Sequence, residues 1–120
     1  MSSPVNLQEN LPLTEATFFI ILTISPAPKH GYAIMKDTAA LSDGRVQLST
    51  STLYGALKRL LEAGWITRVV EDEANNGMEN GRIRKAYTLT DLGRRILEAE
   101  VNRMETLVAA AQQSAAGAQA

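Results

Sequence analysis

The chain of 120 residues contains no cysteine, a single histidine (His30) and few aromatic residues, which make up 5% of the composition. Without cysteine, neither a disulfide framework nor a thiolate metal site is possible. One histidine excludes a multi-histidine metal site within one chain and argues against a catalytic histidine pair. Paired carboxylates occur only in a predicted turn and along the last predicted helix, which are poor places for acid–base catalysis. We therefore predict no metal, no cofactor and no catalytic residue.

Long hydrophobic runs are also absent. The most apolar stretch, residues 18–22, is far too short to span a bilayer, and residues 1–12 lack the basic start and apolar core of a signal peptide. Hydrophobic residues account for 45% of the chain and charged residues for 21%, which is ordinary for one soluble globular domain. The sequence therefore predicts a cytoplasmic protein without a membrane segment.

No large excess of either charge marks the whole chain, whose formal net charge is −1, but basic residues gather in two segments. Residues 45–68 contain four basic residues and one acidic residue, and residues 82–95 contain five basic residues and one acidic residue. Between them, residues 71–79 contain four acidic residues and no basic one. The near-neutral total argues against indiscriminate coating of nucleic acid, whereas the two basic segments allow a local contact with it.

Two helices are predicted in the first third of the chain. Thr14 is a suitable N-cap for the first helix, which ends at Pro26 and Pro28 because proline is not tolerated in a helix interior. The second helix spans about residues 31–41, and its Tyr32 is expected to be structural. One face of the first helix carries Phe18, Ile21, Leu22 and Ser25.

The third predicted helix begins in residues 49–52, four small hydroxyl residues of which any of the first three could be the N-cap. Gly64 suits the left-handed conformation that follows the end of a helix. If the apolar stripe of this helix is buried, the opposite face presents hydroxyl groups, Tyr54, Lys58 and Arg59. The stripe has the spacing of an amphipathic helix packed on a core and consists of Leu53, Leu57, Leu60 and Leu61.

A β-hairpin is predicted after the third helix. Residues 65–70 are β-branched or aromatic apart from Arg68, and residues 82–90 form the return strand. The long tip between the strands is rich in glycine and asparagine, as turns are. Thr90 then begins a last helix that runs to about residue 113.

The last predicted helix carries an apolar seam with the spacing of a helix that packs against a partner helix. The alternative is packing of this seam against its own domain. We favour a homodimer, because the seam extends beyond the reach of a small three-helix core. The predicted dimerisation residues are Leu97, Val101, Met104, Val108 and Ala111.

Three helices followed by two strands are the arrangement of a winged helix, a helix-turn-helix with an appended β-hairpin. The predicted fold is therefore mainly α with a small β-hairpin. It comprises a flexible N-terminal arm (residues 1–12), a winged helix-turn-helix domain (residues 13–89), a long C-terminal dimerisation helix (residues 90–113) and a disordered tail (residues 114–120).

In a winged helix the third helix enters the major groove, so its short side chains can approach bases and phosphates. The ordinary alternatives are that serine and threonine only cap the helix and that surface cations are only solvated. The predicted DNA-binding residues are Ser49, Thr50, Ser51, Thr52, Tyr54, Lys58, Arg59, Arg82, Arg84 and Lys85.

Three linked segments carry a further pattern: residues 13–37 (LTEATFFIILTISPAPKHGYAIMKD), residues 49–66 (STSTLYGALKRLLEAGWI) and residues 81–97 (GRIRKAYTLTDLGRRIL). In order and spacing they resemble the PadR family of bacterial transcriptional regulators. The resemblance implies a winged-helix DNA-binding domain, dimerisation through the C-terminal helix and, usually, repression relieved by a small molecule. With one helix after the wing, the chain is similar to the short branch of the family. It departs from the family pattern at Gly55, where proline is common, and in the acidic residues 71–73, which we expect to point away from DNA.

The predicted function is that of a dimeric, sequence-specific DNA-binding transcriptional regulator, and more specifically a repressor released by a small-molecule effector. Its partners would be double-stranded DNA with a pseudo-palindromic operator and a second copy of the chain. The alternative is a winged helix that no longer binds DNA and uses its dimer face or acidic wing for a protein partner. No group of residues in the sequence supports a third interpretation, a ligand-carrying or enzymatic dimer. The effector pocket is expected near Phe18, Phe19, Ile96 and Met104.

Overall fold

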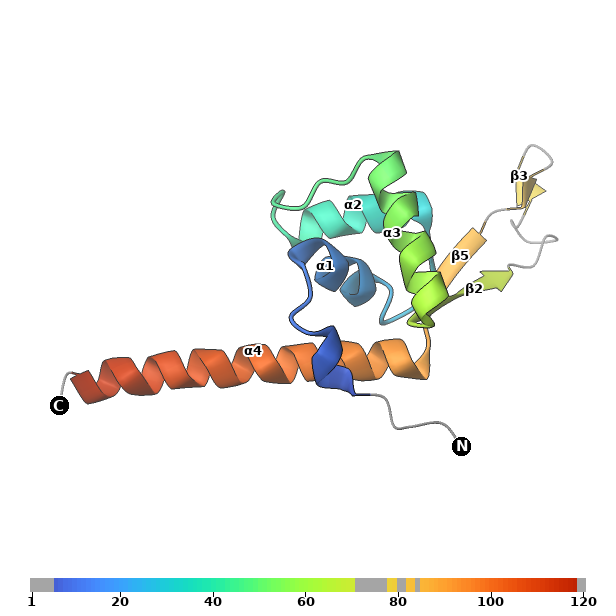
Figure 1. The fold of residues 1–120 in the computed structure, drawn as a ribbon. Helices are drawn as coiled ribbons and strands as arrows, with labels where there is room; N and C mark the ends of the chain where they lie inside the picture. The colour runs from blue at the N-terminus through green and yellow to red at the C-terminus, as the bar shows by residue number, and fades with distance from the viewer. Residues whose placement is uncertain (1–5, 71–77, 80–81, 84, 119–120) are drawn as a thin grey trace, which may run out of the picture.

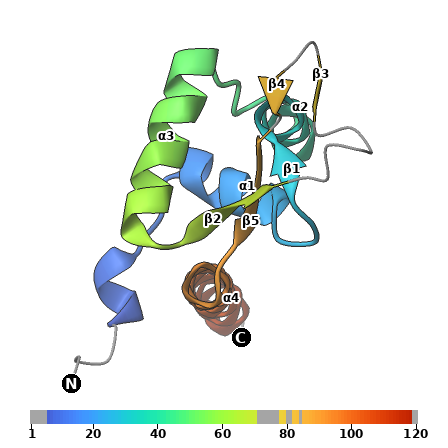
Figure 2. The same cartoon turned by 90° about the vertical axis from the view of Figure 1, so that its right-hand side faces the viewer.

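The computed structural model describes residues 6–70, 78–79, 82–83 and 85–118. Figure 1 shows α1, α2 and α3 packed together, with β2 and β5 at one side and α4 passing beneath them as a long rod. After a 90° turn, Figure 2 shows this rod end-on below the sheet. The predicted order of three helices, a hairpin and a last helix is confirmed in α1, α2, α3, β2, β5 and α4, whereas η1, β1, β3 and β4 are additional to the prediction. The bounds are η1 (Leu7–Asn10, a 3-10 helix), α1 (Glu15–Thr23), β1 (Lys29–His30), α2 (Gly31–Leu41), α3 (Thr50–Ala63), β2 (Ile66–Val70), β3 (Met78–Glu79), β4 (Arg82–Ile83), β5 (Lys85–Leu89) and α4 (Asp91–Ala118).

The main sheet has three antiparallel strands in the order β1-β5-β2. β2 and β5 are the predicted hairpin, in a register that pairs Ile66 with Leu89. Between β2 and β5 in the chain lie two short strands, β3 and β4, which pair with each other in a second, two-stranded sheet. The sequence pattern does not predict β1, because this strand contains only two residues. Its Lys29 donates a hydrogen bond to the Thr23 hydroxyl at 3.2 Å and pairs with the carboxylate of Asp37, so it joins α1 to α2.

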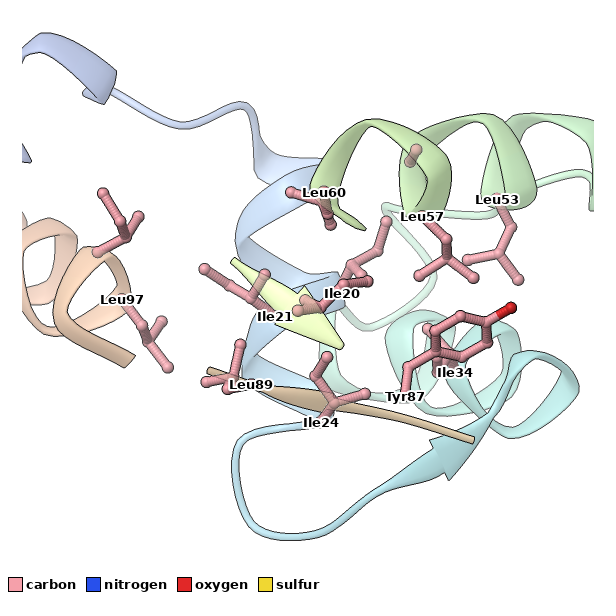
Figure 3. Close-up of a cluster of buried hydrophobic side chains, with 13 residues drawn as sticks. Ile20, Ile21, Ile24, Ile34, Leu53, Leu57, Leu60, Tyr87, Leu89 and Leu97 are labelled. Atoms are coloured by element: carbon pink, nitrogen blue, oxygen red, sulfur yellow. The ribbon is translucent and has the colours of Figure 1, made fainter. Parts of the chain in front are cut away.

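The leucine stripe of α3 forms one wall of the core. Leu53, Leu57 and Leu60 are buried as predicted, and Leu61 is half-buried at the edge. Figure 3 shows the three buried leucines facing the isoleucines of α1 and the ring of Tyr87 on β5. Burial of one such side chain stabilises a fold by roughly 2 kcal/mol. The stripe therefore fixes which face of α3 is turned outward.

The buried face of α1 differs from the predicted one. Ile20, Ile21 and Ile24 are fully buried, whereas Phe18 and Leu22 are half-buried. The segment is apolar on all sides, so its periodicity favours no face, and packing against α2 and α4 makes the choice.

The N-terminal segment is packed rather than loose in its described part. The side chain of Asn6 caps η1 by accepting a hydrogen bond from the backbone N–H of Gln8 at 3.0 Å. η1 lies against α4, and Leu7, Leu11 and Leu13 pack partly buried on the core. Residues 6–12 of the expected flexible arm are therefore packed on the fold, and residues 1–5 lie outside the described residues. The surface that receives the segment belongs to α4, far along the chain, and no local pattern reveals it.

A buried carboxylate connects this segment to α4. The Glu100 side chain is 2% exposed and accepts hydrogen bonds from the backbone N–H of Leu13 at 2.9 Å and from Nε and Nη2 of Arg103 at 2.6 and 3.1 Å. The hydrogen bonds from Arg103 hold the pKa of the Glu100 carboxyl below its ordinary value, against the effect of burial. The bond from Leu13 adds to this lowering. The folded chain therefore stabilises the charged form of Glu100.

Acid is expected to weaken the connection between Glu100 and the N-terminal segment. Because the pKa of Glu100 is lower in the folded chain, its contribution to stability is present above the ordinary pKa of 4.5 and is lost as the pH falls through the lower folded value. We expect Glu100→Gln to lower Tm at pH 7 by about 5 °C and to flatten the fall of Tm as the pH is lowered below the ordinary pKa of 4.5. Glu98→Gln, at an exposed position of the same helix, is the control for thermal melts. If the wild type and Glu100→Gln had identical melting curves at pH 7 and also below pH 4.5, this role of Glu100 would be contradicted.

α4 is longer than predicted. It continues to Ala118, so residues 114–118, which were expected to be disordered, are helical, and residues 119–120 lie outside the described residues. The helix extends well beyond the packed helices α1–α3 (Figure 1). Its residues 105–117 are exposed. Among the described residues no helix, α4 included, is both long and apolar enough to cross a membrane.

Candidate nucleic-acid interface

Ser49 is the N-cap of α3. Its hydroxyl oxygen accepts a hydrogen bond from the backbone N–H of Thr52 at 3.1 Å, and the hydroxyl donates to the hydroxyl of Thr52 at 2.9 Å. Capping is therefore one role of Ser49, the first of the three candidates that the sequence left open. Thr50 and Ser51 are exposed at the same end of the helix, where backbone N–H groups attract phosphate.

The face of α3 opposite the leucine stripe is open to solvent. Within the described part of the chain, neither Lys58 nor Arg59 forms an ion pair. The helix thus buries its leucines and presents hydroxyl and cationic groups, a surface suited to a polyanion. The exposed residues include every predicted DNA-binding residue of α3 and its cap: Ser49, Thr50, Ser51, Thr52, Tyr54, Lys58 and Arg59.

Tyr54 combines exposure with a close contact to α2. The residue is 46% exposed, yet a Cβ built on Gly31 would lie 2.3 Å from its hydroxyl oxygen. The ring therefore lies against the first residue of α2, and any side chain at position 31 would displace it. Through this contact Tyr54 holds α3 against α2 while part of its ring remains accessible.

Two exposed residues of α2, which begins at Gly31, form a pair that the sequence did not assign to the interface. Tyr32, expected to be structural, is in fact 69% exposed. The ammonium group of Lys36 lies 5.6 Å from the centroid of its ring, within the range of a cation–π contact. The four-residue spacing of a tyrosine and a lysine on one helix is visible in the sequence. Tyr32 directly follows Gly31, the residue of α2 that contacts Tyr54 of α3.

The wing is described in part. Lys85, at the start of β5, is exposed. Arg82 lies in β4, in register with Glu79 of β3. Arg84 lies outside the described residues, as do the acidic residues 71–73. Of the predicted wing cations, the structure therefore places the side chain of Lys85.

Two other cations of the basic segments are engaged in contacts within the fold. Nη2 of Arg45 forms an ion pair with the Glu15 carboxylate at 2.7 Å, at the start of α1. Both terminal nitrogens of Arg94 donate to the carbonyl oxygen of Ser25, each at 3.4 Å. Charge counted along the sequence therefore overstates the cationic surface that is free to meet a partner.

The predicted dimerisation seam of α4 is divided between the core and the exterior. Leu97 is 8% exposed and belongs to the core, next in sequence to the fully buried Ile96. Leu97 therefore anchors α4 to its own domain, which differs from its predicted role. The other members of the seam are half-buried or exposed: Val101, Met104, Val108 and Ala111.

A hollow of about 400 Å³ opens between α1 and α4. Phe18 and Met104, two of the predicted effector-binding residues, line it. Ile96 is fully buried in the core, so its predicted contact with an effector is not available in this structure. Phe19 meets Phe18 edge-to-face, with ring centroids 5.4 Å apart, and is not part of the wall. The remaining lining residues are Val101, Glu105, Val108, Ala109 and Gln112.

Three packed helices, an antiparallel wing and a long terminal helix define a winged helix-turn-helix protein. The sequence profile of the Transcriptional regulator PadR-like family matches residues 20–99. The chain therefore belongs to the PadR-like family of transcriptional regulators, which confirms the predicted family and fold. Members of this family are regulators and not enzymes, as predicted for this chain. Within the described ranges, no group of three or more histidine, aspartate or glutamate residues could hold a metal ion.

The chain is also similar to one uncharacterised protein in sequence and to solved structures in fold. The chain is 36% identical over 93 residues to an uncharacterised 37.1 kDa protein in transposon TN4556 of Streptomyces fradiae. The match covers 78% of this chain and 24% of that protein, so the chain spans about a quarter of its length. A PadR family transcription regulator from Clostridium difficile R20291 has the same fold, with a TM-score of 0.66, 24% identity and coverage of 83% of this chain and 97% of that one. Bacillus subtilis PadR in complex with operator DNA gives a TM-score of 0.63 at 23% identity, and the match covers 76% of this chain and 48% of that one.

Proposed function

We propose that this family member is a dimeric regulator that binds a specific DNA sequence through α3. The division of α3 into a buried leucine face and an open face of hydroxyl and cationic groups carries the proposal. The complex of Bacillus subtilis PadR with operator DNA supports it, because that protein shares the fold. DNA is a polyanion, and no acidic residue other than Glu62 lies on α3 to oppose it.

In this proposal the N-terminal half of α3 enters the major groove. Thr50 and Ser51 have side chains short enough to approach base edges, and the helix start favours phosphate. Lys58 and Arg59, further along the helix, meet the phosphate backbone. Additional phosphate contacts come from the wing and from α2, and the candidates are Arg82, Arg84, Lys85, Tyr32 and Lys36.

A second copy of the chain covers the exposed part of the seam on α4. Val108 is 54% exposed on a helix that extends beyond its own domain. Apolar residues at three- and four-residue spacing on such a helix indicate packing against another helix. Two-fold symmetry then places two copies of α3 about 34 Å apart, so the operator is pseudo-palindromic.

The finer part of the proposal is a cytoplasmic repressor released by a small, largely apolar ligand in the hollow. The volume of about 400 Å³ falls in the range of ligand pockets, about 300 to 1,000 Å³. Its walls join Phe18 of α1 to Met104 of α4. Val101, Met104 and Val108 line the hollow and also belong to the seam, so a ligand bound there would lie at the dimer contact and act on it.

Replacing Lys58 by alanine is expected to weaken DNA binding without changing its sequence preference. If Lys58 neutralises one phosphate in each protomer, its removal reduces the slope of log affinity against log salt by about 0.9 per protomer. The measurement is fluorescence anisotropy at several salt concentrations, with DNA selected by the wild-type protein from a random pool. Arg45→Ala, which removes an exposed cation engaged with Glu15, is the matched control and should leave the slope unchanged.

Two outcomes would contradict parts of the proposal. An unchanged slope for Lys58→Ala would remove this residue from the interface. Failure of the wild type to enrich any sequence from the pool would contradict DNA binding itself and favour a protein-interaction module.

A further inference from the structure

The first turn of α4 is bonded to the backbone that ends α3. The hydroxyl of Thr90 donates to the carbonyl oxygen of Gly64 at 2.6 Å, and the backbone N–H of Thr90 donates to the carbonyl oxygen of Trp65 at 3.0 Å. The Thr90 hydroxyl oxygen also accepts a hydrogen bond from the backbone N–H of Gly93 at 3.1 Å, as an N-cap does. One side chain therefore caps α4 and bonds to the end of α3 at the same time.

The end of α3 is itself well fixed. Gly64 adopts a left-handed conformation with φ of 81°, and its N–H donates to the carbonyl oxygen of Leu61 at 3.1 Å. The N–H of Trp65 donates to the carbonyl oxygen of Leu60, also at 3.1 Å. These are the bonds of a Schellman-type helix end. The link from α3 to α4 thus runs through backbone atoms and the short side chain of Thr90.

Gly93 brings the two elements into direct contact. A Cβ built on Gly93 would lie 2.0 Å from the carbonyl oxygen of Trp65. The first turn of α4 therefore packs on the residue that follows the helix end of α3, without an intervening side chain. Such a contact leaves little room for α4 to change its direction relative to α3.

We propose that Thr90 is a positioning residue that fixes the direction of α4 relative to α3, and so the separation of the two recognition helices in the dimer. The part that concerns DNA rests on the proposed function. α4 has 28 residues and is about 42 Å long, so a change of about 10° at its first turn displaces its far end by about 7 Å. A displacement of that size is large compared with the rise of one base pair.

An ordinary helix cap would not have this effect, and the chain offers one for comparison. Thr14 caps α1 by accepting a hydrogen bond from the backbone N–H of Thr17 at 3.1 Å, and its hydroxyl bonds only within the same helix start. Thr14→Val is therefore the matched control for Thr90→Val. Thr90→Ser keeps both bonds of the hydroxyl. Thr90→Asp keeps the cap but has no proton to donate to Gly64.

The first experiment measures the geometry of the joint without DNA. The chain has no cysteine, so Glu62→Cys on α3 and Asn102→Cys on α4 provide unique exposed sites for two nitroxide labels. Doubly labelled chain is mixed with a large excess of unlabelled chain, so that pulsed dipolar spectroscopy reports distances within one chain. We expect one narrow distance distribution for the wild type, Thr90→Ser and Thr14→Val, and a distribution at least about twofold broader for Thr90→Val and Thr90→Asp. A wild-type width in Thr90→Asp overturns the proposal, and this variant decides if Thr90→Val does not fold.

The second experiment tests the consequence for DNA. The selected operator is lengthened by one base pair at its centre, and affinities are compared by anisotropy. The wild type should lose about 30-fold in affinity and Thr90→Asp about fivefold or less, because a looser joint adapts to the new spacing. Equal losses overturn the link to operator spacing. Failure of the wild type to bind any DNA contradicts the proposed function instead, and the label distances still test the joint.

Discussion

Gly93→Ala is expected to destabilise the folded chain strongly, because the added methyl group has no room. Its Cβ would lie 2.0 Å from the carbonyl oxygen of Trp65 and 3.0 Å from Cδ2 of Leu89. The first of these atoms belongs to the backbone, which is held by the bond from Thr90, so no flexible side chain can move aside. Relief requires a shift of α4 or of β2, and we expect a loss of about 3 kcal/mol in the free energy of unfolding.

Urea unfolding followed by circular dichroism measures this loss. Gly117→Ala is the matched control, because it adds the same atom to the same helix and meets nothing within 4 Å. Alanine at that position should be neutral or stabilising by up to about 1 kcal/mol, since it favours the helix. Coincident unfolding curves for the wild type and Gly93→Ala would contradict the close contact between α4 and Trp65.

Val108→Glu is expected to abolish the dimer and, with it, tight operator binding. Val108 lies on the exposed seam of α4, and a glutamate there would place a charge without a partner in an apolar interface. Two-fold symmetry makes each substitution act twice in one interface. We expect the dimer dissociation constant to rise by about 100-fold or more, and operator affinity to fall by a similar factor because the two half-sites are no longer bound together.

Sedimentation equilibrium and anisotropy measure the two effects. Thr106→Glu introduces the same charge on the same exposed part of α4, on the side away from the seam, and should leave both constants unchanged. A monomeric wild type, or a Val108→Glu variant that remains dimeric, would contradict the assignment of the seam. Because Val108 is exposed in the single chain, the variant should still fold, with the helical circular dichroism spectrum of the wild type.

Much of the candidate interface is predictable because α3 has a clear local pattern. Its leucines recur at helical spacing, so their burial determines which side chains point outward, and all the predicted residues on the outer face are exposed. The exposure of Tyr32 and its contact with Lys36 escape prediction, because packing within the folded domain decides which face of α2 is buried. Arg45 counts as part of a basic segment in the sequence, yet the fold pairs it with Glu15 of α1.

The amino-acid sequence alone determines the order of the elements, the outward face of α3 and the β2–β5 hairpin, because periodicity, caps and turn residues act over a few neighbouring positions. Only the tertiary structure decides which face of α1 is buried, since that helix is apolar all round. It also decides that the N-terminal segment docks on α4, through Leu13 and Glu100, and that Thr90 bonds to Gly64. These contacts join positions far apart in the chain, and their energies depend on a geometry that exists only after the chain has folded.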